Sequence, residues 1–245
     1  MMLQRSIPLL LGCLLYACGS TGTAASPSAT RTRVPESTAI PETSPIPPAP
    51  TGTLLPGPRL FTEEFDEGLA YWAFLQVDNG QPAPGPSPEG GFLVFDLPAS
   101  NQWVYALYGS HDYADVRIDA QVEVRAGQDG APGIVCRYGE KDGWYEFNIY
   151  PDQAYSLLFG QWLTQGVARY TPIYRGTSEK IQGAANEIGL ICQGNTLTPF
   201  INGVQIRKAQ VERYGLKTGK IGLSAASFEE TPFMIAYDWV RVSEP

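Results

Sequence analysis

The chain has 245 residues, 43% of them hydrophobic, and a formal net charge of −8 at pH 7. An acidic chain without a basic cluster is unsuited to nucleic acid or to an anionic lipid surface, so neither is expected as a partner. Neutral sugars, cations and basic partners stay open, and residues 59–245 have ample material for the core of one large domain.

The N-terminus carries the pattern of an export signal. Arg5 supplies a positive charge, and residues 7–15 form an apolar run that is too short to span a bilayer. This run leads to Cys18, which follows the small residue Ala17. The stretch resembles the lipobox of bacterial lipoprotein signal peptides, in which the cysteine is lipidated and becomes the new N-terminus. The resemblance implies a signal peptide at residues 1–17.

Two alternatives stay open for this segment. Cys13 would be the modified residue if the apolar run ended earlier, but the run would then have about six residues, below the roughly 7–15 of a signal peptide. The other alternative is an ordinary cleaved signal with release into solution. If Cys18 carries several acyl chains such as palmitate, the protein is anchored to a cell membrane and faces the extracytoplasmic side.

Residues 18–58 change in composition to Pro, Ser, Thr and Ala, with almost no aromatic or bulky side chain. Such a segment cannot bury enough apolar surface to offset its ordering entropy, so a disordered linker is expected. Its prolines favour an extended polyproline II spacer with a rise of about 3.1 Å per residue. The linker is therefore long enough to hold a domain on the order of 100 Å from a membrane.

From residue 59 onward, strand signals recur about every 8–12 residues with turns between them, and helical signals are nearly absent. Residues 116–124 alternate strictly between apolar and polar side chains, which predicts a strand buried on one face. Asn202-Gly203, between two apolar runs, predicts a tight type I′ hairpin. Further strands are expected at residues 92–97, 104–107, 133–138, 155–159, 187–192, 220–226 and 234–242.

Residues 144–150 alternate in the same way. Tyr145, Phe147 and Ile149 belong to one face of the expected strand. The opposite face carries Trp144, Glu146, Asn148 and Tyr150. A turn at residues 139–143 connects this strand to the preceding one, which ends near Cys136 and Arg137.

Several short motifs follow one another in a recognisable order: Phe61-x-x-x-Phe65, Gly133-Ile134-Val135-Cys136-Arg137, Gly143-Trp144-Tyr145-Glu146-Phe147, Asn186 with Cys192-x-Gly194, Gly219-Lys220-Ile221-Gly222-Leu223, and Tyr237-Asp238-Trp239-Val240-Arg241-Val242. This order resembles the concanavalin A-like lectin and glucanase sandwiches, specifically the laminin-G-like and 3-keto-disaccharide-hydrolase-like domains of bacterial surface lipoproteins. The resemblance spans nearly all of residues 59–245. It implies an all-β fold of two antiparallel sheets in a jelly-roll sandwich, often with a carbohydrate site on the concave face.

Some members of this superfamily bind calcium. Asp66 and Asp238, near the two ends of the domain, are the candidate ligands that the resemblance suggests. Aspartate is also common in turns, so this remains an open alternative. No other metal site and no other cofactor is predicted.

Cys136 and Cys192 are the only cysteines after the linker, and both lie in predicted strands. In an oxidising compartment an even pair of this kind favours a disulfide, which would constrain the unfolded chain by roughly 3–4 kcal/mol. Two buried free thiols are the alternative. His111 is the only histidine, so the sequence offers few residues for Cys-His catalysis or for a Cys/His zinc site.

The sequence does not show the carboxylate pattern of a laminarinase-type active strand, and no catalytic residue is assigned. A two-carboxylate mechanism needs carboxyl groups about 5–10 Å apart. Asp119, Glu123 and Glu146 could still meet across neighbouring strands, so a glycoside hydrolase or related sugar-active enzyme remains the main alternative. A structural or adhesion module with a protein partner is the second.

Binding is the preferred interpretation, and a glycan is the expected ligand of this surface-tethered domain. It rests on aromatic residues in excess of what a sandwich core requires: Trp103, Tyr105, Tyr108, Trp144, Tyr150, Tyr155, Trp162 and Tyr170. The expected ligand-binding residues are Arg137, Trp144, Glu146, Asn148 and Tyr150. Arg137 should join Glu146 and Asn148 in one polar cluster, because antiparallel neighbours on one face come within about 5 Å. An Arg–Glu pair on a solvated sheet is the alternative.

Overall fold

The computed structural model describes residues 56–77 and 82–245. The predicted signal peptide, the candidate lipidation sites Cys13 and Cys18, and the linker up to residue 55 lie outside the described residues. Within the described part of the chain, no helix has the length and hydrophobicity needed to cross a bilayer.

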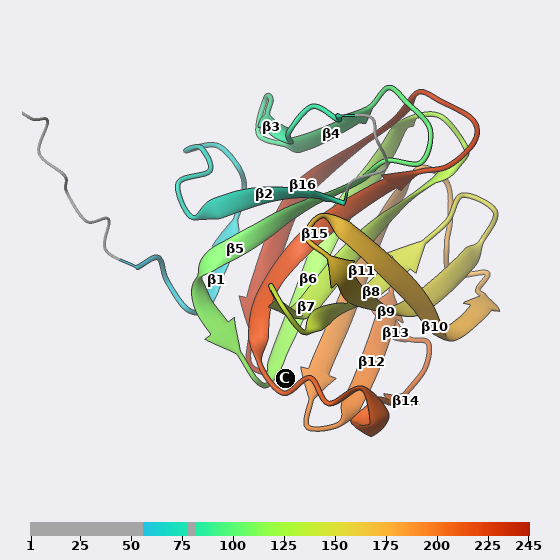
Figure 1. The fold of residues 1–245 in the computed structure, drawn as a ribbon. Coiled ribbons are helices and arrows are strands. Elements are labelled where there is room, and N and C mark those ends of the chain that lie inside the picture. The colour runs from blue at the N-terminus through green and yellow to red at the C-terminus, as the bar shows by residue number, and fades with distance from the viewer. Residues whose placement is uncertain (1–55, 78–81) are drawn as a thin grey trace, which may run out of the picture. The chain divides into compact units, whose positions relative to one another are not determined.

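From residue 59 onward, the described residues form a sandwich of two antiparallel sheets (Figure 1). Sheet A has nine strands: β1 (Phe61–Glu63), β3 (Ser87–Pro88), β4 (Leu93–Leu97), β6 (Val116–Ala126), β11 (Ala185–Gln193), β12 (Thr196–Ile201), β13 (Val204–Gln205), β14 (Ala209–Gln210) and β16 (Phe233–Ser243). Sheet B has seven: β2 (Trp72–Val77), β5 (Trp103–Tyr113), β7 (Gly130–Gly139), β8 (Gly143–Ile149), β9 (Ala154–Thr164), β10 (Val167–Thr177) and β15 (Gly219–Ser227). A single 3-10 turn, η1 (Glu212–Tyr214), precedes β15. The predicted all-β jelly-roll class is confirmed.

Each strand expected from the sequence is present, and most extend by one or more residues beyond the expected ends. The strand predicted at residues 116–124 is β6, and it lies inside sheet A between β11 and β16. Its apolar positions Ile118, Ala120 and Val122 are buried against sheet B. Asn202 and Gly203 both have positive φ angles, 48° and 74°, as a type I′ hairpin requires.

Strand β10 was not expected. Pro172 lacks a backbone N–H, and a proline inside an apolar run argues against a strand in the interior of a sheet. In the structure β10 lies at the edge of sheet B, where it pairs only with β9. The pairing register also shifts between Pro172 and Tyr174. An edge position and a bulge are among the settings in which a strand tolerates proline.

The disulfide between Cys136 and Cys192 joins β7 of sheet B to β11 of sheet A, as predicted from the cysteine count. Both cysteines are fully buried in the main core. The bond closes a loop with a sequence separation of 56 residues, for which loss of chain entropy in the unfolded state predicts a stabilisation of about 3–4 kcal/mol. The disulfide thereby ties the two sheets together covalently.

Candidate functional site

The outward face of sheet B, which is turned away from the core, carries the predicted site residues of β8. Tyr145 and Phe147 point into the main core, whereas Trp144 belongs to a separate cluster on the outward face. The alternation predicted for this strand is therefore confirmed. β8 lies near the middle of sheet B, between β7 and β9, so its outward side chains have a strand on either side.

Glu146 is at the centre of this face and is only 1% exposed. Its Oε2 accepts hydrogen bonds from the Tyr105 hydroxyl and from Trp144 Nε1, each 3.0 Å long. Its Oε1 accepts a 2.9 Å bond from Ser224 Oγ. The Tyr170 hydroxyl is 2.7 Å from that of Tyr105, and it is the donor there because Tyr105 gives its proton to Glu146. The carboxyl is thus enclosed by hydrogen-bond donors from three strands, β5, β8 and β15, and Tyr170 of β10 supports one of these donors.

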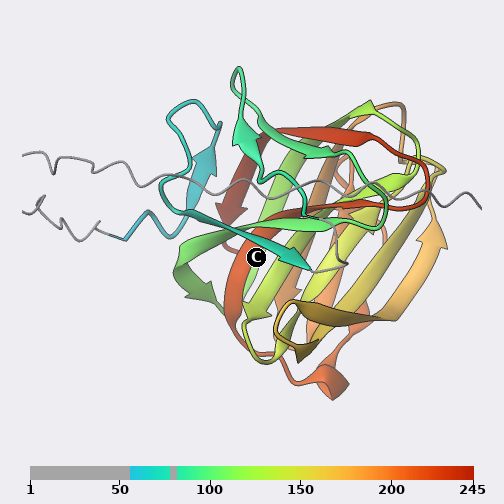
Figure 2. The same cartoon turned by 45° about the horizontal axis from the view of Figure 1, so that its top comes forward.

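The hairpin of β9 and β10 covers this carboxyl. In Figure 1 the first part of β10, in gold, crosses in front of the other strands of sheet B, and Figure 2 shows the same hairpin after rotation. Trp162, Ala168 and Tyr170 from the hairpin pack on the outward cluster. The rings of Trp162 and Trp144 are 5.0 Å apart, and Tyr170 stacks on Trp103 of β5 at 5.8 Å. The centre of the face is therefore filled with side chains.

This arrangement offers little to a hydrolytic mechanism. On the seven strands of sheet B, Glu146 and Asp112 are the only acidic residues. Asp112 is at the end of β5, where it pairs with Lys220 at 3.0 Å. His111 Nε2 lies 2.7 Å from the carbonyl oxygen of Gly57, which gives this ring a structural contact. The buried Glu146 has no second carboxylate beside it on these strands, as glycoside hydrolysis by two carboxylates requires.

Burial raises the pKa of Glu146 above its ordinary value of 4.5, and the hydrogen bonds from Trp144, Ser224 and Tyr105 only partly oppose the shift. The folded protein then holds this proton more tightly than the unfolded chain. The contribution of Glu146 to stability is full below pH 4.5 and decreases as the pH rises through the raised pKa. We expect the unfolding free energy of the parent, minus that of Glu146→Gln, to fall between pH 4 and pH 7 in urea titrations. A difference that rises with pH would show a lowered pKa instead.

Arg137 does not join Glu146, so the predicted polar cluster is wrong in this respect. Arg137 has a φ of 54°, and the pairing of β7 with β8 shifts after Cys136. This bulge turns the Arg137 side chain away from the outward face and brings Tyr138 there instead, 5.8 Å from the Trp144 ring. The Arg137 guanidinium, 1% exposed, donates to the carbonyl oxygens of three loops, at Ala114, Gly194 and Leu216.

The other predicted residues differ in accessibility. Trp144 is fully buried, so it cannot be the open aromatic platform that was expected. Asn148 is 3% exposed, and its Oδ1 finds no hydrogen-bond donor among the described residues. That oxygen lies against Gly133, where an added Cβ would come within 2.0 Å of it. Tyr150 is half-buried, and it is the more accessible of the two aromatic residues among the expected ligand-binding residues.

Four half-buried rings, one from β10 and three from the ends of β5, β15 and β8, form a continuous line that we call the aromatic belt: Tyr170, Trp103, Phe228 and Tyr150. Trp103 is 5.8 Å from Tyr170 and 6.2 Å from Phe228 between ring centroids. Phe228 stacks on Tyr150 at 6.0 Å with an interplanar angle of 23°. The hydroxyl of Tyr150 is held 2.9 Å from Ser156 Oγ. Phe228 was not anticipated because it lies just beyond β15, outside any alternating pattern.

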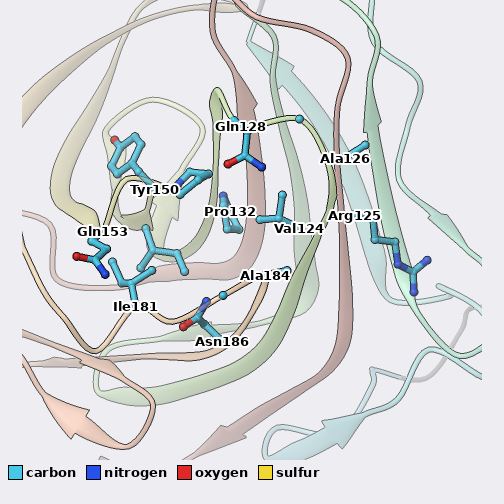
Figure 3. Close-up of a pocket in the computed structure, with 14 residues that line it drawn as sticks. Val124, Arg125, Ala126, Gln128, Pro132, Tyr150, Gln153, Ile181, Ala184 and Asn186 are labelled. Atoms are coloured by element: carbon cyan, nitrogen blue, oxygen red, sulfur yellow. The ribbon is translucent and has the colours of Figure 1, made fainter.

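The belt ends at Tyr150, between two hollows. One has a volume of about 530 Å³ and lies at the end of the sandwich (Figure 3). The other, of about 370 Å³, is lined by acidic side chains that include Asp129, Asp152 and Glu230. Both hollows share Gln128, Tyr150 and Pro151 as lining residues.

The candidate calcium ligands Asp66 and Asp238 are both exposed. Across residues 56–77 and 82–245, no group of three or more Asp, Glu, His or Cys side chains is placed to hold a metal ion. Asp66 lies near Gly91, and Asp238 occupies a shift in the pairing of β16 with β6. The arrangement of acidic side chains gives the calcium expectation no support, and calcium binding stays a prediction.

No protein-family model matches this sequence, and neither does any curated protein sequence. Solved structures do match. The carbohydrate-binding module CBM66 from Bacillus subtilis is 12% identical, with a TM-score of 0.51 over 72% of this chain and 97% of the module. A family 16 glycoside hydrolase of a mixed-linkage glucan locus in Bacteroides ovatus is 11% identical, with a TM-score of 0.54 over 75% of this chain and 99% of its own.

A third match is a protein of unknown function with a galectin-like fold from Bacillus subtilis. It is 11% identical, with a TM-score of 0.56 over 76% of this chain and 95% of that one. At these identities the likeness concerns the fold alone. The chain has the fold of an antiparallel two-sheet jelly-roll sandwich, the fold class that its sequence motifs suggested.

Proposed function

We propose that this protein is an extracellular carbohydrate-binding module that holds a glycan along the aromatic belt. The observation that carries the proposal is the unbroken line of half-buried rings from Tyr170 through Trp103 and Phe228 to Tyr150. Tyr and Trp suit such a site because each combines an apolar ring with a polar edge. Sugar rings have apolar faces that stack on aromatic rings, while their hydroxyl groups remain in water or bind nearby polar groups.

Binding is favoured over hydrolysis by the state of Glu146. A catalytic carboxyl has to reach the scissile bond, whereas Glu146 is 1% exposed and its oxygens accept three hydrogen bonds from neighbouring side chains. The hairpin of β9 and β10 stands between this carboxyl and any ligand. A role in holding the aromatic cluster together fits these contacts.

The solved structures with this fold add support from two sides. One is named as a carbohydrate-binding module and another was solved with a glucan product, so the sandwich is used for sugar recognition with and without catalysis. The fold alone does not establish a function. The aromatic belt is the feature of this chain that indicates glycan binding.

Trp103→Ala is expected to weaken binding to neutral oligosaccharides on a glycan array by about tenfold or more. Loss of stacking on one ring removes on the order of 1 kcal/mol, and the neighbouring rings Tyr170 and Phe228 lose their support. Phe228→Ala should give a similar loss of affinity, because Phe228 belongs to the same belt but follows a different strand. Isothermal titration with the best array ligand measures both changes.

Phe74→Ala is the matched control. Phe74 is an aromatic residue of β2 that is 46% exposed and lies outside the belt. Its replacement should leave glycan affinity unchanged. If Trp103→Ala and Phe228→Ala bind as tightly as the parent while their melting temperatures show intact folds, the belt is not the site.

We also propose that the domain is tethered to a membrane through lipid on Cys18, as its sequence context suggests. In a bacterial host, Cys18→Ala is expected to move the protein out of the membrane fraction or to leave the signal uncleaved. Metabolic labelling with a fatty acid should then be lost. Cys13→Ala serves as the control, because its label should persist. Label that persists in Cys18→Ala and disappears in Cys13→Ala would assign the anchor to Cys13.

A further inference from the structure

The larger hollow beside Tyr150 is built from three regions of the chain at one end of the sandwich (Figure 3). The end of β6 and the following loop form one wall, and the turn after β8 forms the second. Residues 181–186, before and at the start of β11, form the third. Its volume of about 530 Å³ falls within the range of about 300–1,000 Å³ that is usual for small-ligand pockets.

The floor of this pocket is apolar and belongs to the end of the main core. Ile149 and Ile181 are 3% and 4% exposed, and Val124 packs against the same core. Pro132 adds a further buried surface. A ligand that carried hydroxyl groups on every side would leave them facing this floor without partners, which costs free energy. The floor therefore favours a small apolar group.

The rim is polar but uncharged. Gln128 and Gln153 supply amide side chains from opposite walls. Arg125 is the only charged lining residue, and Figure 3 shows it directed away from the others. Its guanidinium lies over the ring of Phe92 at 4.3 Å and pairs with Glu123 at 3.7 Å. The pocket interior thus offers neutral hydrogen-bonding groups above an apolar floor.

Asn186 provides a directed donor within the pocket. It is only 3% exposed, and its Oδ1 already accepts bonds from the backbone N–H of Gln182 and from Asn202 Nδ2. In Figure 3 the amide nitrogen of Asn186 faces the other pocket residues. No described residue accepts a hydrogen bond from this nitrogen. A carbonyl oxygen of a ligand would satisfy it.

We propose that this pocket binds the acetamido group of an N-acetylated sugar in a glycan that lies on the aromatic belt. The inference rests on the proposed function, because Tyr150 is both the last ring of the belt and a wall of the pocket. The acetamido methyl group fits the floor of Val124, Ile149 and Ile181. The acetamido carbonyl oxygen accepts a hydrogen bond from the free Asn186 N–H. The acetamido N–H group lies at the rim, where the side chains carry amide groups. A 2-hydroxyl group offers no methyl group to the floor.

The test uses matched pairs of glycans that differ only at the sugar C2 position. The full-length protein, purified in detergent, is screened on an array in which each N-acetylated glycan stands beside its 2-hydroxyl counterpart. Titration with chitotetraose and cellotetraose then measures one such pair in solution. We expect the N-acetylated member to bind about tenfold tighter, because one methyl group is buried and one hydrogen bond is gained.

Variants separate the pocket from the belt. Val124→Thr keeps the side-chain shape but places a hydroxyl group in the floor, and Asn186→Asp removes the N–H donor. Both should abolish the preference for the N-acetylated member while leaving affinity for the 2-hydroxyl member unchanged. Trp103→Ala should weaken both members by the same factor. Melting temperatures identify a variant that fails to fold. If Asn186→Asp fails to fold, the result for Val124→Thr decides whether the pocket binds the acetamido group.

Four results would overturn the inference. Equal affinity for the two members, with both lost in Trp103→Ala, leaves the proposed function standing and removes the acetamido pocket. A preference that survives both pocket variants assigns it to another site. Tightest binding of the deacetylated, cationic oligomer assigns recognition to the acidic hollow with Asp129, Asp152 and Glu230. Absence of binding to every glycan removes the proposed function and the inference together.

Discussion

Replacing Arg137 with alanine is expected to lower the free energy of unfolding by about 4 kcal/mol, because three buried or partly buried carbonyl groups lose their donors at a cost of about 1–3 kcal/mol each. The guanidinium donates to Ala114 O at 2.7 Å, Gly194 O at 2.8 Å and Leu216 O at 2.9 Å. Burial lowers the pKa of Arg137, because desolvation disfavours its charged form. This cost of burying the charge makes the net loss of stability smaller than the sum of the losses at the three carbonyl groups. Urea denaturation measures the change.

Arg137→Gly provides an internal comparison for this prediction. The φ of 54° at this position lies in the left-handed region, which an alanine side chain resists by roughly 1–2 kcal/mol and a glycine does not. The glycine variant loses the same hydrogen bonds but should be more stable than the alanine variant by about 1 kcal/mol. The exposed Arg175 gives the control, since Arg175→Ala should change stability little. A loss below about 1 kcal/mol in Arg137→Ala would mean that water replaces the guanidinium.

The same residue shows why part of the site was not predictable. The alternation in residues 116–124 and 144–150 follows from burial of one sheet face, and a period of two is visible in the sequence itself. The run Cys136-Arg137-Tyr138 also reads as simple alternation, which would place Arg137 outward. One bulged residue inverts that assignment, because a single insertion exchanges the two faces for every later side chain. No local sequence pattern predicts that Arg137 donates hydrogen bonds to carbonyl groups in distant loops.

The covered state of Glu146 was hidden for a related reason. Its position on the outward face could be predicted, but its burial depends on β10, a strand that was not predicted from the sequence. Contact between Trp103 and Tyr170 joins residues 67 positions apart in the sequence, across several strands of sheet B. The pocket at the end of the sandwich likewise comes from three separate regions. The disulfide was predictable because only two cysteines were available to pair.

Trp144→Ala is expected to lower the free energy of unfolding by about 5 kcal/mol, since truncation of a fully buried tryptophan typically costs about 3–5 kcal/mol and a hydrogen bond is lost as well. Trp144 is 0% exposed, and its ring contacts those of Tyr105, Tyr138 and Trp162. Its Nε1 donates to Glu146, which would be left with one donor fewer in a buried site.

Trp144→Phe separates the two causes. The phenyl ring retains most of the packing but has no N–H, so we expect a loss of about 2 kcal/mol from the missing donor and the smaller volume. Binding measured below the melting temperature of each variant then distinguishes support from contact. If Trp144 only supports the belt, Trp144→Phe binds oligosaccharides almost as tightly as the parent while Trp103→Ala does not. A Trp144→Phe variant with parental stability and tenfold weaker binding would contradict a purely supporting role for Trp144.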